Sequence, residues 1–237
     1  MPMFRNAAFC LALLVPVVLL GFWPKYLDVI GSVRLSLHIH FATMSLWVLV
    51  LIVQAGLIRG HRGGLHRTIG RVAGFGLGPV LIWSGLVVCH EMLRRGPIEI
   101  SPRDLGAFAL SVGALLPFIV TWALALVYRK VPRLHARFMI STGIAIIGAG
   151  LARALKFWMP GFESTSAACH GNFIVLELVS LALVAADWRA GMRRSPFLVI
   201  LALMLFAHLL WVTSDSALWR SFSEVYYNLP AMAPWDA

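Results

Sequence analysis

The sequence predicts an all-α fold: a polytopic membrane bundle of about seven transmembrane helices, in a single domain that covers residues 1–237. Hydrophobic residues make up 60% of the chain and charged residues only 13%, whereas soluble domains are about half apolar and roughly a quarter charged. The apolar residues form long blocks, each close to the roughly 20 residues that cross a bilayer as a helix. A net charge of +10 would suggest nucleic acid in a soluble chain. Here the basic residues separate apolar blocks, so they indicate topology and anionic lipid headgroups, and no nucleic acid partner is expected.

The apolar segments are expected at residues 7–23, 35–58, 69–89, 105–128, 138–159, 173–188 and 196–212. The first follows Arg5, as a signal peptide would, but no small-residue cleavage site follows it and Pro24 and Lys25 do. We therefore interpret it as a helix of the bundle. The three cysteines have no metal-like spacing and predict no disulfide framework.

The loops between these segments alternate in charge. Eleven of the 20 Lys and Arg residues lie in alternate loops or at their edges: Arg59, Arg62, Arg67, Arg71, Arg129, Lys130, Arg133, Arg137, Arg189, Arg193 and Arg194. Most acids lie in the other loops: Asp28, Glu91, Glu99, Asp104, Glu163, Asp215, Glu224 and Asp236. The positive-inside rule then predicts that the arginine-rich loops and the N-terminus are cytoplasmic and that the C-terminus is outside.

The third segment begins with a histidine and continues with a stripe of glycines. His66, Gly70, Gly74 and Gly78 recur every four residues, which places them on one slowly drifting face of a helix. Such a stripe lets another helix backbone, or a flat ligand, approach closely. His66 is therefore either a cofactor ligand or a polar cap above a tight helix crossing.

The histidines fall into two layers. Six of the eight lie at the ends of predicted helices: His38, His40 and His90 at the outer face, and His61, His66 and His135 at the arginine-rich face. Two layers are typical of a bundle that holds two b-type haems, each iron bound by two imidazoles. We expect His66 and His135 to bind one haem b, and His40 or His38 to bind the other with His90. Hydrogen bonds to helix ends or lipid headgroups are the alternative.

Two geometric points refine these ligand sets. His38 and His40 are two residues apart, so only one can face a given site. His40 is favoured because its face continues into Met44 and Trp47. His66 and His90 would point about 120° apart on an ideal helix. A shared face therefore needs a bend or bulge, which Pro79 could supply.

The fifth segment repeats the histidine-and-arginine opening of the third. Arg67, Arg71 and Arg137 are candidates for binding haem propionates. Arg153 lies far inside an apolar segment, so it needs a partner, for which Glu177 is the candidate. An anion or propionate clamp is the other interpretation of Arg153.

Three further polar residues have simpler expected roles. Asp187 is expected to pair with Arg189 at the interface. His208 is expected to form a helix-to-helix hydrogen bond, and His170 to be solvated in an outer loop.

Several of these motifs together resemble a family of predicted bacterial membrane proteins, the domain of unknown function 2306. The matching elements are His40 with Gln54, the run Leu65, His66, Arg67, Gly70 and Arg71, the run His135, Arg137 and Met139, and Asp187 before Trp188. The resemblance covers roughly residues 38–189, a family-like core of about 35–190. It implies a multi-pass protein of the bacterial inner membrane but no activity. The chain departs from the family at Ala136 and in its short, glycine-rich loop around residues 60–64. The layout is also similar to that of two-haem b-type membrane cytochromes.

Two functions remain open. The first is a haem b protein that passes electrons across the bilayer, as an electron carrier or membrane oxidoreductase, with a quinol or a redox protein as its partner. The absence of histidine from segment 105–128 counts against it. The second is a haem-free bundle that acts as a transporter, assembly factor or sensor. No phosphate loop, HExxH motif or nucleophile–base pair supports hydrolysis, and the sequence leaves the oligomeric state open.

Overall fold

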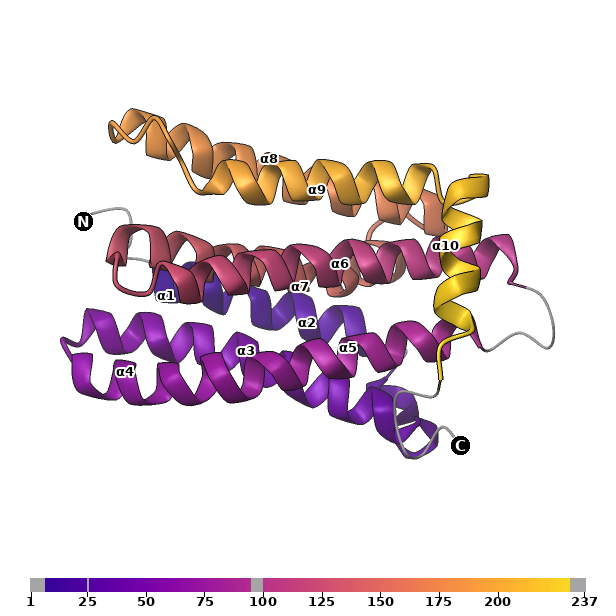
Figure 1. Cartoon of the computed structure of the whole chain (residues 1–237), viewed down its shortest axis with the longest axis horizontal. Coiled ribbons are helices and arrows are strands. Elements are labelled where there is room, and N and C mark those ends of the chain that lie inside the picture. The colour runs from indigo at the N-terminus through magenta and orange to yellow at the C-terminus, as the bar shows by residue number, and fades with distance from the viewer. Residues whose placement is uncertain (1–6, 25, 95–99, 231–237) are drawn as a thin grey trace.

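The computed structural model describes residues 7–24, 26–94 and 100–230, and this part of the chain is helical without strands (Figure 1). Its elements in order are α1 (Ala7–Ala12), α2 (Leu14–Phe22), the 3-10 helix η2 (Leu27–Ser32), α3 (Leu35–Arg59), α4 (Gly63–Val72), the π-helical turn η3 (Ala73–Leu77), α5 (Gly78–Leu93), α6 (Pro102–Val127), α7 (Pro132–Trp158), α8 (Thr165–Arg189), α9 (Phe197–Val212) and α10 (Ala217–Tyr227). All seven predicted apolar segments are therefore helical. Arg5, Lys25, Glu99 and Asp236, which the sequence argument used, lie outside the described residues.

Five helical stretches are long and apolar enough to cross a membrane: α3, α4 to α5, α6, α7 and α8. A sixth is formed if α9 and α10 count as one span, although they meet at 94°. The first apolar stretch, Ala7–Phe22, is shorter. Many large apolar side chains point outward, including Leu49 of α3, Leu178 of α8 and Leu209 of α9, each at least half exposed. The chain is a multi-pass membrane protein whose apolar surface fits contact with lipid.

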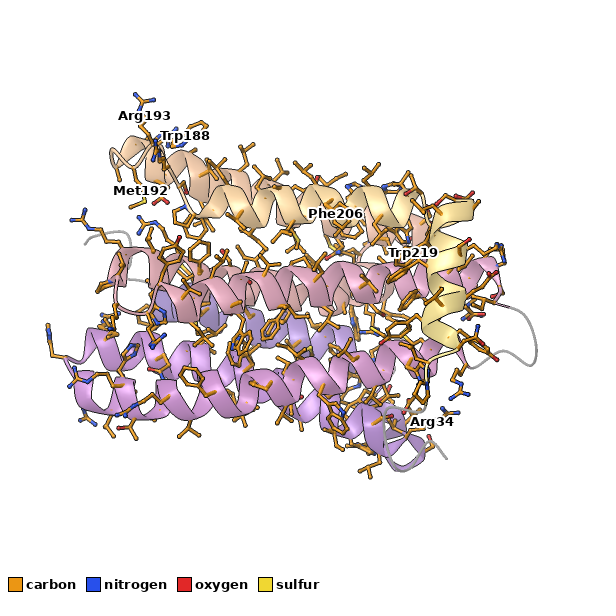
Figure 2. The ribbon with its side chains drawn as sticks, viewed as in Figure 1. Arg34, Trp188, Met192, Arg193, Phe206 and Trp219 are labelled. Atoms are coloured by element: carbon orange, nitrogen blue, oxygen red, sulfur yellow. The ribbon has the colours of Figure 1, made fainter. Side chains whose placement is uncertain are left out.

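The three arginine-rich connections lie at one end of the bundle. The turns from α3 to α4, from α6 to α7 and from α8 to α9 meet there, at the left of Figure 1. Arg193 and Trp188 mark this end in Figure 2, and Trp219 marks the other. We name them the arginine end and the opposite end. The gathering of basic residues that the sequence predicted is thus present in the fold.

Helix α7 lies at the centre of the packing and contacts α2, α3, α6, α8 and α9. Its backbone comes close to that of α2, because a Cβ on Gly21 would lie only 2.1 Å from the carbonyl oxygen of Gly150. In the core, the buried indole of Trp47 donates a hydrogen bond to Thr142 Oγ1 at 3.0 Å. Glycines that allow backbone contact, with buried polar side chains paired across helices, are what lipid-embedded bundles require.

A π turn interrupts the helix that carries His66 and His90. The N–H of Gly78 bonds to the carbonyl of Ala73, five residues back. In the same register the carbonyl of Gly74 would need the N–H of residue 79, which is Pro79 and has none. The indole N–H of Trp122 on α6 supplies the missing donor, at 3.1 Å. The predicted bulge is present, but one extra residue leaves His66 and His90 about 140° apart, on different faces.

Helix α10 is not among the elements predicted from the sequence. This helix crosses the opposite end of the bundle nearly at right angles to α9 (Figure 1). The Trp219 indole donates to the carbonyl oxygen of Leu105 at 3.1 Å, and the Tyr226 hydroxyl donates to that of Leu86 at 3.0 Å. Because α10 has only 11 residues and mixes polar with apolar positions, it lacks the long apolar run of a span.

The contact between α5 and α6 can be tested with two neighbouring glycines, Gly78 at the start of α5 and Gly76 in the π turn before it. A Cβ on Gly78 would lie 2.4 Å from Trp122 Nε1, and the hydrogen bond to Gly74 prevents the indole from moving away freely. We expect Gly78→Ala to lower the free energy of unfolding by about 1–3 kcal/mol, measured by thermal or denaturant unfolding in detergent. Gly76→Ala is the matched control, because nothing lies within 4 Å of its Cβ position. Equal stability of the two variants would contradict the contact.

Candidate functional site

His66 and His135 converge at the arginine end, as the sequence predicted. His66 lies on α4 and His135 in the first turn of α7, and their ring centroids are 6.4 Å apart with the ring planes at 80°. Helix α7 begins at Pro132. Proline lacks a backbone N–H, but the N–H groups of a first helical turn have no partner within the helix, so none is lost. The short connection from α6 then directs His135 back towards the end of α6.

The His135 ring is held by a backbone carbonyl. Its Nδ1 lies 2.9 Å from the oxygen of Ala125, one of the last four carbonyls of α6, which the helix itself leaves without a partner. A carbonyl only accepts, so Nδ1 carries the proton and Nε2 carries the lone pair. This is the arrangement usual for metal-binding histidines.

Two buried polar atoms beside His66 have no hydrogen-bond partner. They are Nδ1 of His66 itself and Oε1 of Gln54 on α3. The amide nitrogen of Gln54 donates to the His66 carbonyl at 3.2 Å, which places the glutamine against this turn of α4. Buried polar atoms are rarely left unpaired, so a ligand or water is the expected partner.

The glycine stripe below His66 is a packing surface. Cβ atoms on Gly70, Gly74 and Gly78 would meet the side chains of Gln54, Leu126 and Trp122, at 3.3, 3.0 and 2.4 Å respectively. The stripe packs against other helices, but it is filled by side chains of α3 and α6 and not by a closely approaching backbone. The space that a flat ligand could have used beside Gly74 and Gly78 is filled by α6.

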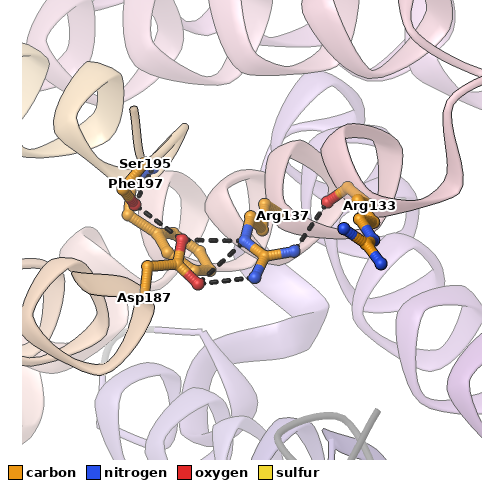
Figure 3. A network of polar contacts seen from close by, with 5 residues as sticks. All are labelled: Arg133, Arg137, Asp187, Ser195 and Phe197. Carbon is orange, nitrogen blue, oxygen red and sulfur yellow. Dashed lines mark hydrogen bonds and ion pairs between the residues drawn. The ribbon is translucent and has the colours of Figure 1, made fainter. Parts of the chain in front are cut away.

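The arginines at this end have different roles. Arg67 and Arg71 are exposed on α4, on the same helix as His66. Arg137 is 4% exposed and binds the carboxylate of Asp187, with Nε 2.7 Å from Oδ2 (Figure 3). Its Nη1 donates to the Arg133 carbonyl, and Ser195 Oγ donates to the same carboxylate at 2.7 Å. Arg137 is therefore occupied, and the expected pair of Asp187 with Arg189 is wrong.

The histidines of the opposite end do not form a second pair. His40 Nδ1 lies 3.2 Å from Ser84 Oγ, and His90 Nε2 lies 3.1 Å from the Leu229 carbonyl oxygen. Ser84 and His90 are six residues apart on α5, which separates the two sites by about 9 Å along the helix. His40 is on the core-facing side of α3, as expected, with Met44 buried below it.

His38 faces away from that core. The Tyr26 hydroxyl and Nδ1 of His38 share a hydrogen bond at 2.7 Å. Burial raises the pKa of the Tyr26 phenol above its ordinary value, so the phenol stays neutral.

The predicted pair of Arg153 and Glu177 is also wrong. Arg153 Nη1 donates to the Ala149 carbonyl at 3.3 Å, and its guanidinium lies 4.7 Å from the centre of the Phe22 ring. Glu177 instead accepts from His208 at 2.9 Å, so the interhelical bond predicted for His208 is confirmed. His170 lies on α8, not in a loop, with its Nδ1 2.9 Å from His208 Nε2. The sequence did contain a signal, because His170 and Glu177 are seven residues apart and share one helix face.

Within the described residues, no three histidine, cysteine, aspartate or glutamate side chains gather as a metal site. Comparison with known proteins finds no family model, no curated protein and no solved structure that matches this chain. The resemblance to the domain of unknown function 2306 therefore stays a prediction, based on the motifs around His66 and His135.

The buried pair at the arginine end predicts a non-additive mutant cycle. Asp187→Asn leaves the buried Arg137 guanidinium without an anion, and we expect it to cost about 3–5 kcal/mol of unfolding free energy. Arg137→Met alone leaves the buried carboxylate without its cation and should also be costly. The double change Arg137→Met with Asp187→Asn removes both charges and should cost less than the sum of the two single changes. Equilibrium unfolding in detergent measures all variants.

Arg189→Gln is the control for this cycle, because Arg189 is exposed. We expect it to change stability by no more than about 0.5 kcal/mol. Additive losses in the Arg137 and Asp187 variants would contradict the pair.

Proposed function

We propose that this protein is a seven-span protein of the bacterial inner membrane that binds one haem b between His66 and His135 and carries electrons there. The observation that supports it is the ring pair at 6.4 Å. A metal–nitrogen bond of about 2 Å on each side would set two ring centroids roughly 6 Å apart. The carbonyl of Ala125 holds His135 in the tautomer that a ligand needs, and the buried Nδ1 of His66, which has no hydrogen-bond partner, supports a role for His66 as the second ligand.

The number of protein donors favours haem over a bare metal ion. Two imidazoles are too few for the four-coordinate sites that free transition metals usually occupy. A porphyrin supplies four nitrogens and takes only two axial ligands from the protein. When bound, the haem would supply one-electron transfer, with a quinol or a redox protein as its partner. Arg67 and Arg71 are the arginines that remain for the propionates, since Arg137 is tied to Asp187.

The proposal is limited to one haem, because His40, His38 and His90 bind three different partners at the opposite end. A haem-free bundle is the competing function. The packing of Trp122 and Leu126 over Gly78 and Gly74 favours it, because a porphyrin cannot lie over those glycines. A bound haem must therefore lie on the arginine-end side of Leu126.

The haem can be tested by spectroscopy of the purified full-length protein. From cells grown with ample haem, we expect one haem b per chain with sharp reduced-state absorbance bands. The ferric form should give the electron paramagnetic resonance signal of axial imidazoles with nearly perpendicular planes, because the two rings stand at 80°. His66→Ala and His135→Ala should each lose the haem.

His61→Ala and His40→Ala are the controls, since His61 is exposed at the same end and His40 lies elsewhere. Both should retain the haem. A colourless native protein would establish the haem-free alternative. Haem that survives the loss of either His66 or His135 would contradict this pair of ligands.

The orientation in the membrane can be tested with reporter fusions. With seven spans and a cytoplasmic N-terminus, alkaline phosphatase fused after Ala237 should be active. The same enzyme fused after Met192, in the turn between α8 and α9 at the arginine end, should be inactive. The reverse pattern would place the arginine end outside the cytoplasm.

A further inference from the structure

A chain of three titratable side chains connects α8 and α9 in the half of the bundle nearer the opposite end. Glu177 Oε1 lies 2.9 Å from His208 Nδ1, and His208 Nε2 lies 2.9 Å from His170 Nδ1. No part of the proposed haem site uses these groups, and the inference drawn from them does not depend on that site.

The chain leads from the surface into the membrane span. His170 is exposed near the start of α8, whereas the Glu177 side chain is 17% exposed and that of His208 20%. Glu177 is two turns, or about 10 Å, deeper along α8 than His170. Burying an ionised carboxyl group at that depth is costly unless the group has a partner. Such groups usually mark a functional site.

The rings of the chain are fixed by aromatic neighbours. Phe173 stacks on His208 with ring centroids 4.7 Å apart and planes at 14°. Trp211 meets His170 edge-on, also at 4.7 Å. Both imidazoles are therefore aligned by packing as well as by hydrogen bonds, which favours a defined path over a mobile cluster.

The hydrogen-bond directions follow from the carboxylate. An ionised Glu177 only accepts, so His208 Nδ1 donates to it. His208 Nε2 is then the acceptor, and His170 Nδ1 donates to it. The one nitrogen left outside the chain is His170 Nε2, which carries a lone pair on an exposed residue.

The charged groups on neighbouring helices are few. On α7, which packs against α8, Arg153 and Lys156 lie near Cys169, on the surface side of Glu177. Lys156 bonds to Thr165 Oγ1 at 2.6 Å. Helix α9 contributes His208, and α6, on its other side, carries Arg103 and Asp104 only in its first turn. In the described contacts, Glu177 has one ion-pair partner, which is His208.

We propose that Glu177 takes up and releases a proton through His208 and His170, in exchange with water at the opposite end. A proton from water binds His170 Nε2, and the Nδ1 proton of His170 moves to His208 Nε2. The Nδ1 proton of His208 then moves to Glu177 Oε1. Glu177 becomes neutral, both imidazoles end neutral, and one proton has entered.

Both states of the chain keep every hydrogen bond. After uptake, the Glu177 hydroxyl donates to His208 Nδ1, and His208 Nε2–H donates to His170 Nδ1. The same two contacts therefore serve either state, with their direction reversed. The three side chains follow one another in a line and do not surround a common point. This agrees with the absence of a three-ligand metal group among the described residues.

The exchange can be tested by carbodiimide labelling in sealed vesicles that contain the full-length protein. Dicyclohexylcarbodiimide dissolves in the bilayer and reacts with protonated carboxyl groups. It can reach Glu177 from lipid, because its neighbours Ile174, Leu178 and Leu181 are about half exposed. Protease access to a tag after Ala237 identifies vesicles with the opposite end outward, and mass spectrometry measures labelling at Glu177.

We expect labelling to follow only the pH on the side of the opposite end. For any carboxyl group at a pH above its pKa, acidification by one unit raises the protonated fraction up to about tenfold. His208→Asn keeps a donor to Glu177 but cannot pass a proton, and His170→Ala removes the exposed end of the chain. Both variants should lose the dependence on that pH, while His61→Ala, at the arginine end, should keep it.

Each contrary outcome overturns the relay. Native labelling that ignores the pH at the opposite end, or follows the pH at the arginine end, would contradict it. So would native-like pH dependence in His208→Asn or His170→Ala. Gel filtration of each variant confirms that the bundle is intact, so loss of dependence is not loss of fold.

Discussion

A guanidinium and a carboxylate that are buried together fix the arginine end of the bundle. Arg137 of α7 and Asp187 of α8 are almost fully buried, and Ser195, just before α9, completes the carboxylate's partners. Neither charge can be left alone in apolar surroundings, so the ends of three helices are held in one arrangement. His135 lies two residues before Arg137 on α7. The position of the pair of His66 and His135 therefore depends on this buried ion pair.

The same constraint recurs in a milder form throughout the bundle. In lipid, a backbone carbonyl without a helical partner must find a donor from the protein. Side chains of other helices meet this need at Ala125, to which His135 donates, and at Gly74, to which Trp122 donates. Trp219 and Tyr226 of α10 add donors to carbonyls within α6 and α5, at Leu105 and Leu86. Each of these contacts joins two helices, so the donors specify which helices pack together.

The sequence predicted the elements better than the pairs between them. Apolar blocks and alternating arginines identified the seven helical segments and the arginine end, because length and charge act locally along the chain. Partners depend on helix rotation and neighbour order, which one sequence does not contain. Arg153 and Glu177 have opposite charges and similar depths, which led to the predicted pair. In the structure Glu177 accepts a hydrogen bond from His208, and Asp187 pairs with Arg137. The pairing of His66 with His135 could be anticipated, because both open a helix at the same end. The glycine stripe could not be interpreted from sequence, because the filling side chain, Trp122, comes from another helix.

The π turn at Ala73–Leu77 determines the directions in which the side chains of α5 point. Each helical residue turns the chain by about 100°, so one extra residue rotates the second half of the helix by that amount relative to the first. Ser84 meets His40, and His90 meets Leu229, only in this rotated phase. One continuous helix can therefore present His66 to α7 at one end and His90 to α10 at the other, as two separately oriented surfaces on a single rod.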